Sequence, residues 1–131
     1  MKHASLIALL SAAALAPAAS ASASADDFSL GYDVDRFPAA QLSVKACHAA
    51  LARGAAAVGY VTRNQTDQGT LATHVSGPAG GGRALVSYCL SAGDHTAFVI
   101  QAFDYSGPDS RATDPVKARV AAEVRKAAGA R

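Results

Sequence analysis

The chain has 131 residues, of which 50% are hydrophobic and 17% are charged, with a formal net charge of +2. This length fits one domain and excludes a large multi-domain enzyme, and the near-neutral charge excludes a strongly basic nucleic-acid-binding protein. The two cysteines exclude both a four-cysteine zinc site within one chain and a dense disulfide scaffold.

Residues 1–25 have the composition of a secretory signal peptide. Lys2 supplies a positive charge, residues 6–16 are apolar, and the small residues that follow end in the A-x-A cleavage site of residues 23–25. The apolar part has about half of the ~20 residues needed to span a bilayer, which argues against a membrane anchor. We therefore expect residues 1–25 to be cleaved and residues 26–131 to form a single domain. That domain would be periplasmic or secreted, and the alanine bias is typical of a bacterial protein.

A strand and a helix open the mature chain. Apolar and polar residues alternate over residues 28–35, which predicts a half-buried strand with one apolar and one polar face, and Pro38 ends this strand. Ser43 is the expected N-cap of a helix that ends at Gly59. Gly54 lies on the apolar stripe of this helix, where the missing side chain would allow close approach to a sheet.

Further strands and a second helix complete the predicted order. The predicted strands are residues 60–63, 71–76, 83–90 and 95–105, with a turn at 64–69 and a glycine-rich hairpin loop at 77–82. Residues 98–100 are apolar on both faces, which predicts a central strand covered on each side. Asp114 is expected to cap the last helix, with Pro115 at its first position. The order β-α-β-β-β-β-α predicts an α+β fold, an antiparallel sheet of about five strands with two helices packed on it.

Cys47 and Cys89 carry the most specific long-range signal. Cys47 falls on the apolar stripe of the first helix and Cys89 in a predicted strand. An even pair of thiols in an exported protein favours a disulfide, and closing a loop of about 43 residues would stabilise the fold by roughly 4 kcal/mol. Thiol redox chemistry favours close C-x-x-C spacing, and the wide separation here argues against it.

The histidines do not have the spacing of a metal site. Cys47 and His48 are adjacent on a helix and point about 100° apart, so they cannot easily chelate one ion. His74 and His95 are the candidates for a copper or zinc site if the fold brings them together, although no H-x-x-x-H or H-x-H pattern supports it. We predict no metal site and no cofactor from this pattern.

Asp33 and Asp35 share one face of the first strand. Their carboxylates would lie about 7 Å apart, close to the separation in an inverting glycosidase. Such an enzyme needs a long cleft, and a domain of this size offers little wall for one. We expect these carboxylates to be solvated or to pair with Arg36 or Arg63, and we predict no catalytic residue.

A further group of features resembles a known family. These are Tyr32, Val34 and Arg36 in the first strand, Cys47 on an alanine-rich helix, Gly59-Tyr60, the glycine loop, Cys89 and residues 101–105. They resemble a family of small exported proteobacterial proteins classed as a domain of unknown function, over Phe28 to about Tyr105. The resemblance implies an exported protein with paired cysteines and supplies no activity or ligand.

The expected function is that of a non-enzymatic binding or accessory module. Its partner would be an envelope protein or a small molecule, with no role in nucleic-acid binding and no membrane span. Apolar residues on both faces of residues 84–90 also favour a homodimer, unless the helices cover both faces of the sheet.

Overall fold

The computed structural model describes residues 27–130, so the predicted signal peptide lies outside the described residues. It confirms the predicted α+β fold and the order β-α-β-β-β-β-α. The elements are β1 (Ser29–Pro38), α1 (Val44–Ala57), β2 (Val61–Asp67), β3 (Leu71–Gly77), β4 (Arg83–Ala92), β5 (His95–Asp104) and α2 (Asp114–Ala127).

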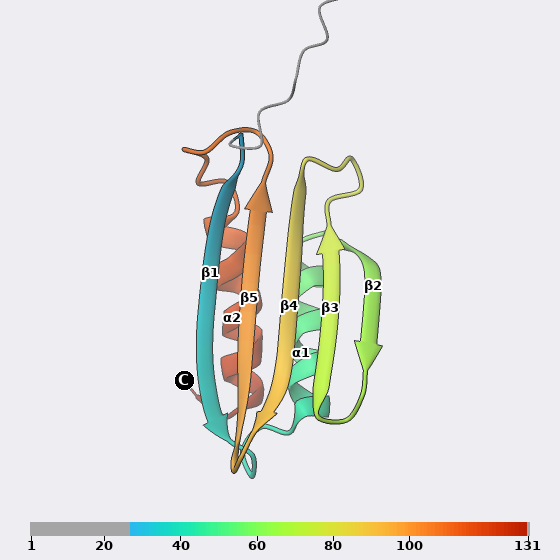
Figure 1. Cartoon of the computed structure of the whole chain (residues 1–131), viewed down its shortest axis with the longest axis vertical. Coiled ribbons are helices and arrows are strands. Elements are labelled where there is room, and N and C mark those ends of the chain that lie inside the picture. Colours follow the sequence, from blue (N-terminus) through green and yellow to red (C-terminus); the bar gives the residue numbers. More distant parts are fainter. Residues whose placement is uncertain (1–26, 131) are drawn as a thin grey trace, which may run out of the picture.

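All five strands form one antiparallel sheet in the order β1-β5-β4-β3-β2. β2 to β5 are a meander of neighbouring hairpins, and β1 adds to the far side of β5. Figure 1 shows both helices behind the sheet, with α2 behind β1 and β5 and α1 behind β4 and β3. The molecule therefore has two layers, and only one face of the sheet is covered by helices.

The hydrophobic core lies between the helices and this covered face. Its largest apolar side chains are Phe98, Ile100 and Leu85 from the sheet, Leu51 and Val120 from the helices, and Leu42 from the connection between β1 and α1. Alanines fill much of the remaining helix surface, which allows α1 and α2 to lie close together. Gly54 approaches Val120 of α2, so the close approach expected at this glycine is to the second helix and not to the sheet.

Three details differ from the sequence-based expectation. β2 continues to Asp67, because residues 64–67 pair with β3 although their side chains are polar and exposed. Asp114 lies inside α2, whose N-cap is Thr113 and has no side-chain capping bond. β5 is an inner strand, as predicted, but helices cover only one of its faces.

The two edge strands differ in where their polar side chains lie. Every residue of β2 is exposed, and a register shift between Thr62 and Asn64 interrupts its pairing with β3. β1 carries Asp33 and Asp35 on the side that faces α2.

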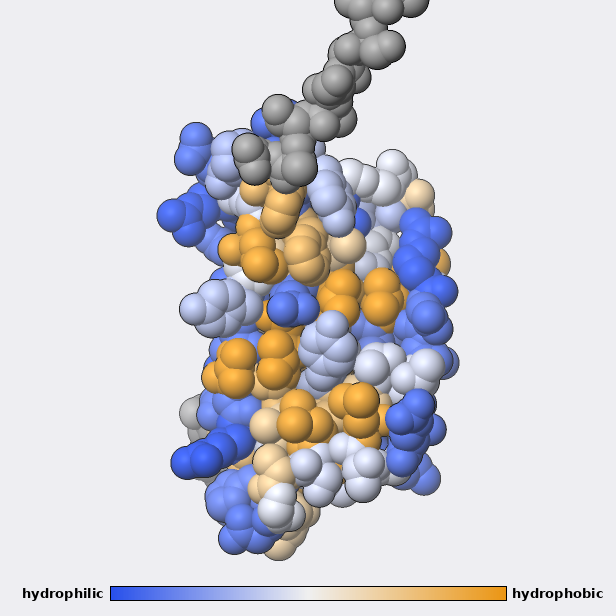
Figure 2. Space-filling model, in the orientation of Figure 1, coloured by the Kyte–Doolittle hydropathy of each residue, from blue (hydrophilic) through white to orange (hydrophobic). Residues whose placement is uncertain are grey.

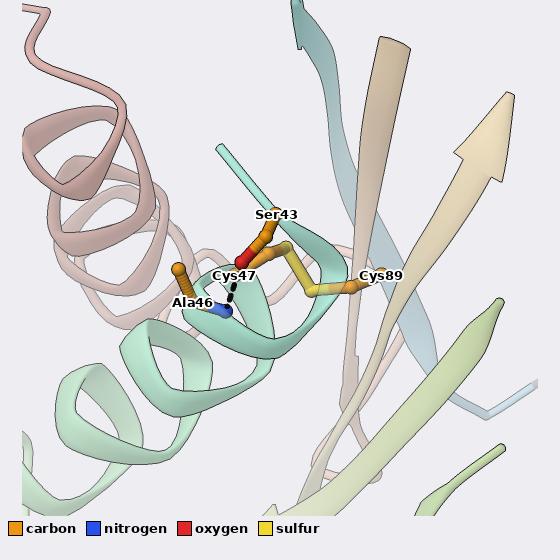
Figure 3. The surroundings of a disulfide bond; sticks show 4 residues. All are labelled: Ser43, Ala46, Cys47 and Cys89. Atoms are coloured by element: carbon orange, nitrogen blue, oxygen red, sulfur yellow. Dashed lines mark hydrogen bonds between the residues drawn. A yellow bond between two sulfur atoms is a disulfide. The ribbon is translucent and has the colours of Figure 1, made fainter. Parts of the chain in front are cut away.

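The predicted disulfide joins the two layers. Cys47 of α1 is bonded to Cys89 of β4, with 6.0 Å between the Cα atoms, and both residues are fully buried. Ser43 is the N-cap of α1, as predicted, and its hydroxyl oxygen accepts a hydrogen bond from the Ala46 amide at 3.0 Å. Figure 3 shows that the disulfide bridges the first turn of α1 and the sheet. The bond thus fixes α1 on the covered face.

Candidate functional site: the open face of the sheet

The face of the sheet opposite the helices is predominantly apolar. We call it the open face. It consists of Leu30, Tyr32, Val34 and Arg36 of β1, Ala97, Val99, Gln101 and Phe103 of β5, Ala84, Val86, Tyr88 and Leu90 of β4, and Leu71, Thr73 and Val75 of β3. Figure 2 views this face and shows apolar side chains spread across the sheet, with hydrophilic residues along its flanks.

Strand β1 presents its apolar side to solvent. Tyr32 is 70% exposed, Val34 55% and Leu30 48%. The strand register sets Val34 beside Val99 and then Tyr88, so the exposed side chains of β1 continue into those of β5 and β4. The alternation predicted from sequence is present, but the apolar face is the uncovered one.

An aromatic cluster extends the open face beyond the ends of β1 and β5. The rings of Phe28, Phe103 and Tyr105 have centroids between 6.1 and 6.5 Å apart. Phe28 and Tyr105 remain 39% and 59% exposed. Exposed aromatic rings in contact with one another are typical of binding surfaces, because they supply large contact areas at a low cost in conformational entropy.

The acidic residues of β1 and β5 lie on the covered face. The Arg125 guanidinium of α2 donates hydrogen bonds to Asp33 at 2.9 Å and to Asp35 at 3.1 Å, and it lies 5.6 Å from the centroid of the Phe98 ring. Hydrogen bonding to Asp33 is the main cause that raises the pKa of Arg125. The expected partners Arg36 and Arg63 are therefore not the ones that the fold provides. Since both carboxylates bind one arginine, they fix α2 against β1.

Asp104 is a buried carboxylate that sequence reasoning did not single out. It accepts hydrogen bonds from the backbone amide and hydroxyl of Ser106, from the Ser110 hydroxyl and from Arg83. The hydrogen bonds from Ser106 and Ser110 hold the pKa of Asp104 well below its usual range. This residue orders the connection between β5 and α2. The only sequence signal for it is an Asp followed two residues later by Ser, a common turn pattern.

The histidines pair differently from the expectation. His74 is fully buried on the covered face, whereas His95 begins β5 on the side of the open face and is hydrogen bonded to Asp94. The structure therefore does not bring His74 and His95 together. Instead the rings of His48 and His74 lie 6.3 Å apart beneath α1, and the Thr62 hydroxyl is 3.0 Å from His74 Nε2. Among the described residues, no three His, Cys, Asp or Glu side chains are grouped to hold a metal ion.

The glycine-rich loop closes the β3–β4 hairpin, as predicted. The guanidinium of Arg63 in β2 donates hydrogen bonds to the carbonyl oxygens of Pro78 and Ala79. These bonds hold the loop against β2. Neither helix in the described part of the chain is long and apolar enough to cross a membrane.

The comparison with known families covers nearly all of the described residues. The family of unknown function DUF6180 matches residues 27–129. The chain belongs to DUF6180. The matched range contains all the strands and both helices, so the open face and the Cys47–Cys89 bond are features of the DUF6180 region of this chain. A comparison with curated proteins gives no match.

Proposed function

We propose that this DUF6180 protein is an exported, non-enzymatic binding module, periplasmic or secreted, which binds a partner through the open face. One observation carries the proposal. Apolar side chains of β1, β5, β4 and β3 point away from the helices, whereas the carboxylates of β1 and β5 point toward them. A sheet that has one face in water has the opposite arrangement, with polar residues outside.

The three carboxylates on the covered face of the sheet support a role without catalysis. Asp33 and Asp35 are bound to Arg125, and Asp104 is bound to serines and Arg83. Each of these groups has a structural contact that accounts for its position. The disulfide supports export, because such bonds form and persist in oxidising compartments.

Site-directed photo-crosslinking in the intact host cell tests the proposed surface. A photoreactive amino acid replaces Val34 or Val99 on the open face, and Ala122 on the exposed side of α2 serves as the control. We expect the same crosslinked product at positions 34 and 99 and none at 122. A second substitution, Tyr88→Lys, should remove that product. Equal labelling at all three positions would contradict the proposed surface.

Metal binding at the His48–His74 pair is a second candidate function. Nε2 of His48 and Nδ1 of His74 are both buried and have no hydrogen-bond partner. Copper and zinc accept imidazole nitrogen, and a buried nitrogen without a partner is otherwise costly. Calorimetric titration with Zn(II) and with Cu(I) under reducing conditions tests this candidate. The expected result is binding that the His48→Asn variant loses, and absence of binding by the native protein would eliminate it.

A further inference from the structure

We propose that the open face is occupied by a second copy of this chain, with the two sheets packed face to face around a two-fold axis. This inference rests on the proposed function and names the partner of the same surface. The resulting dimer would have four layers, helices outside and two sheets inside. Such sheets pack about 10 Å apart, with their strands at about −30°.

The size of the open face is compatible with a small dimer interface. A strand of 10 residues, such as β1, β4 or β5, is about 33 Å long, and the four strands of the open face span about 19 Å. The face therefore covers on the order of 600 Å², allowing for the shorter β3. A stable complex buries about 600–1,000 Å² on each partner, and the largest apolar patch of a typical monomer is about 300–600 Å², so the open face lies where the two ranges meet. One more copy of the same sheet covers the whole patch.

The distribution of charge on this face also fits a homodimer. The centre consists of Val99, Tyr88, Val86 and Gln101, none of which carries a charge at neutral pH. Arg36 lies near the end of the edge strand β1, at the rim, where its guanidinium can stay in water. Interfaces between identical subunits are depleted of charge at the core and more apolar than transient interfaces. An acidic or basic partner would find no opposite charge at the centre.

Gln101 adds a reason to prefer a second copy over an apolar ligand. It carries the amide of the central rows, and the strand register sets it between Tyr32 and Val86. A buried amide needs both a donor and an acceptor. A facing Gln101, or a Tyr88 hydroxyl, from a second copy supplies both, whereas a lipid chain supplies neither.

Sedimentation of the mature protein, purified from cells that express the full chain, tests the dimer. We expect twice the chain mass over a wide range of concentrations. Val99→Lys places an ammonium group at the centre of the interface, and Tyr32→Lys places one on a residue exposed enough that the isolated fold tolerates it. Val99→Lys should weaken the dimer at least about a hundredfold, because burying an unpaired charge costs several kcal/mol, and Tyr32→Lys on the edge strand β1 should weaken it by a smaller factor. Ala122→Lys adds the same charge to α2 and should leave the dimer intact. Thermal melts identify any variant that fails to fold.

The outcomes separate this inference from the proposed function. A native dimer that both lysine variants dissociate supports it. A native monomer, or a dimer that both folded variants retain, overturns it. A monomer that forms the crosslinks at Val34 and Val99 with another molecule keeps the proposed function and rejects the second copy. Intramolecular crosslinks to residues 1–26 would assign the face to that segment instead, and a monomer without crosslinks would overturn both.

Discussion

Gly54 of α1 packs directly against the backbone of α2, because a Cβ atom at position 54 would lie 2.9 Å from the Cα atom of Val120. Real Cβ atoms are essentially never found so close to another heavy atom. The two helices can therefore meet at this distance only if residue 54 has no side chain. This contact sets the spacing of the helix layer, and with it the position of each helix over the sheet.

Gly54→Ala should destabilise the domain by about 1–3 kcal/mol, the usual cost of overpacking a core, in spite of the higher helix propensity of alanine. Urea unfolding measures the change. Gly80→Ala is the matched control, since a Cβ atom there meets nothing within 4 Å. It should change the free energy of unfolding by less than about 0.5 kcal/mol. A stabilised Gly54→Ala variant would show that the helices can separate without cost.

Removal of the disulfide should lower the free energy of unfolding by roughly 4 kcal/mol, because the reduced unfolded chain regains the entropy of the open loop. The Cys47→Ala, Cys89→Ala double variant measures this by denaturant unfolding. Since both cysteines are fully buried, the native protein should resist reduction by dithiothreitol until denaturant is added. Two thiols that can be alkylated in the native protein would contradict the bond.

Arg125→Lys should destabilise the contact between α2 and β1, because an ammonium group cannot donate to Asp33 and Asp35 in the fixed geometry of a guanidinium. The three side chains are between 24% and 39% exposed, so water screens the ion pairs and the expected loss is only about 1 kcal/mol. Unfolding at low and high salt measures it, and the difference between native and variant should shrink as salt rises. Arg119→Lys is the control and should change little, because the Arg119 side chain is 57% exposed and has a single contact of 3.4 Å with Glu123.

The free energy of unfolding should fall as the pH drops below about 6.5. Burial, and secondarily the His48 ring, lower the pKa of His74 from its ordinary value of 6.5. His74 in the unfolded chain therefore takes up a proton at a pH where the folded one stays neutral. Below about pH 6.5 the unfolded state therefore binds more protons than the folded state. The contribution of His74 to stability is complete above about pH 6.5 and is lost as the pH falls toward the lower pKa of the folded state. The slope reaches at most about 1.4 kcal/mol per pH unit.

Urea unfolding between pH 5 and pH 8 compares the native protein with two variants. His74→Asn should lose the part of the slope that His74 contributes. His48→Asn should retain most of it, because burial is the larger cause of the lowered pKa. An unchanged slope in His74→Asn would assign the acid sensitivity to another group.

The order of the elements, the Ser43 cap and the Cys47–Cys89 bond could be predicted because each depends on local pattern or on a pairing without alternatives. The open face could not. The alternation in β1 shows that the strand has an apolar side, but which side is covered depends on where helices distant in sequence come to lie. The same limit applies to Arg125, which is 90 or more positions from Asp33 and Asp35. The rings of His48 and His74 lie close together only because α1 packs on β3.

The two edges of the sheet have a consequence for the protein at high concentration. The free amide and carbonyl groups of an edge strand can form hydrogen bonds with a strand of another chain. Repeated addition of strands in this way produces fibrils. The shift in register between Thr62 and Asn64 distorts one edge, and the inward carboxylates of Asp33 and Asp35 disfavour a further strand at the other. Both edges of the sheet therefore oppose lateral growth. These features favour self-association of a finite size over polymerisation.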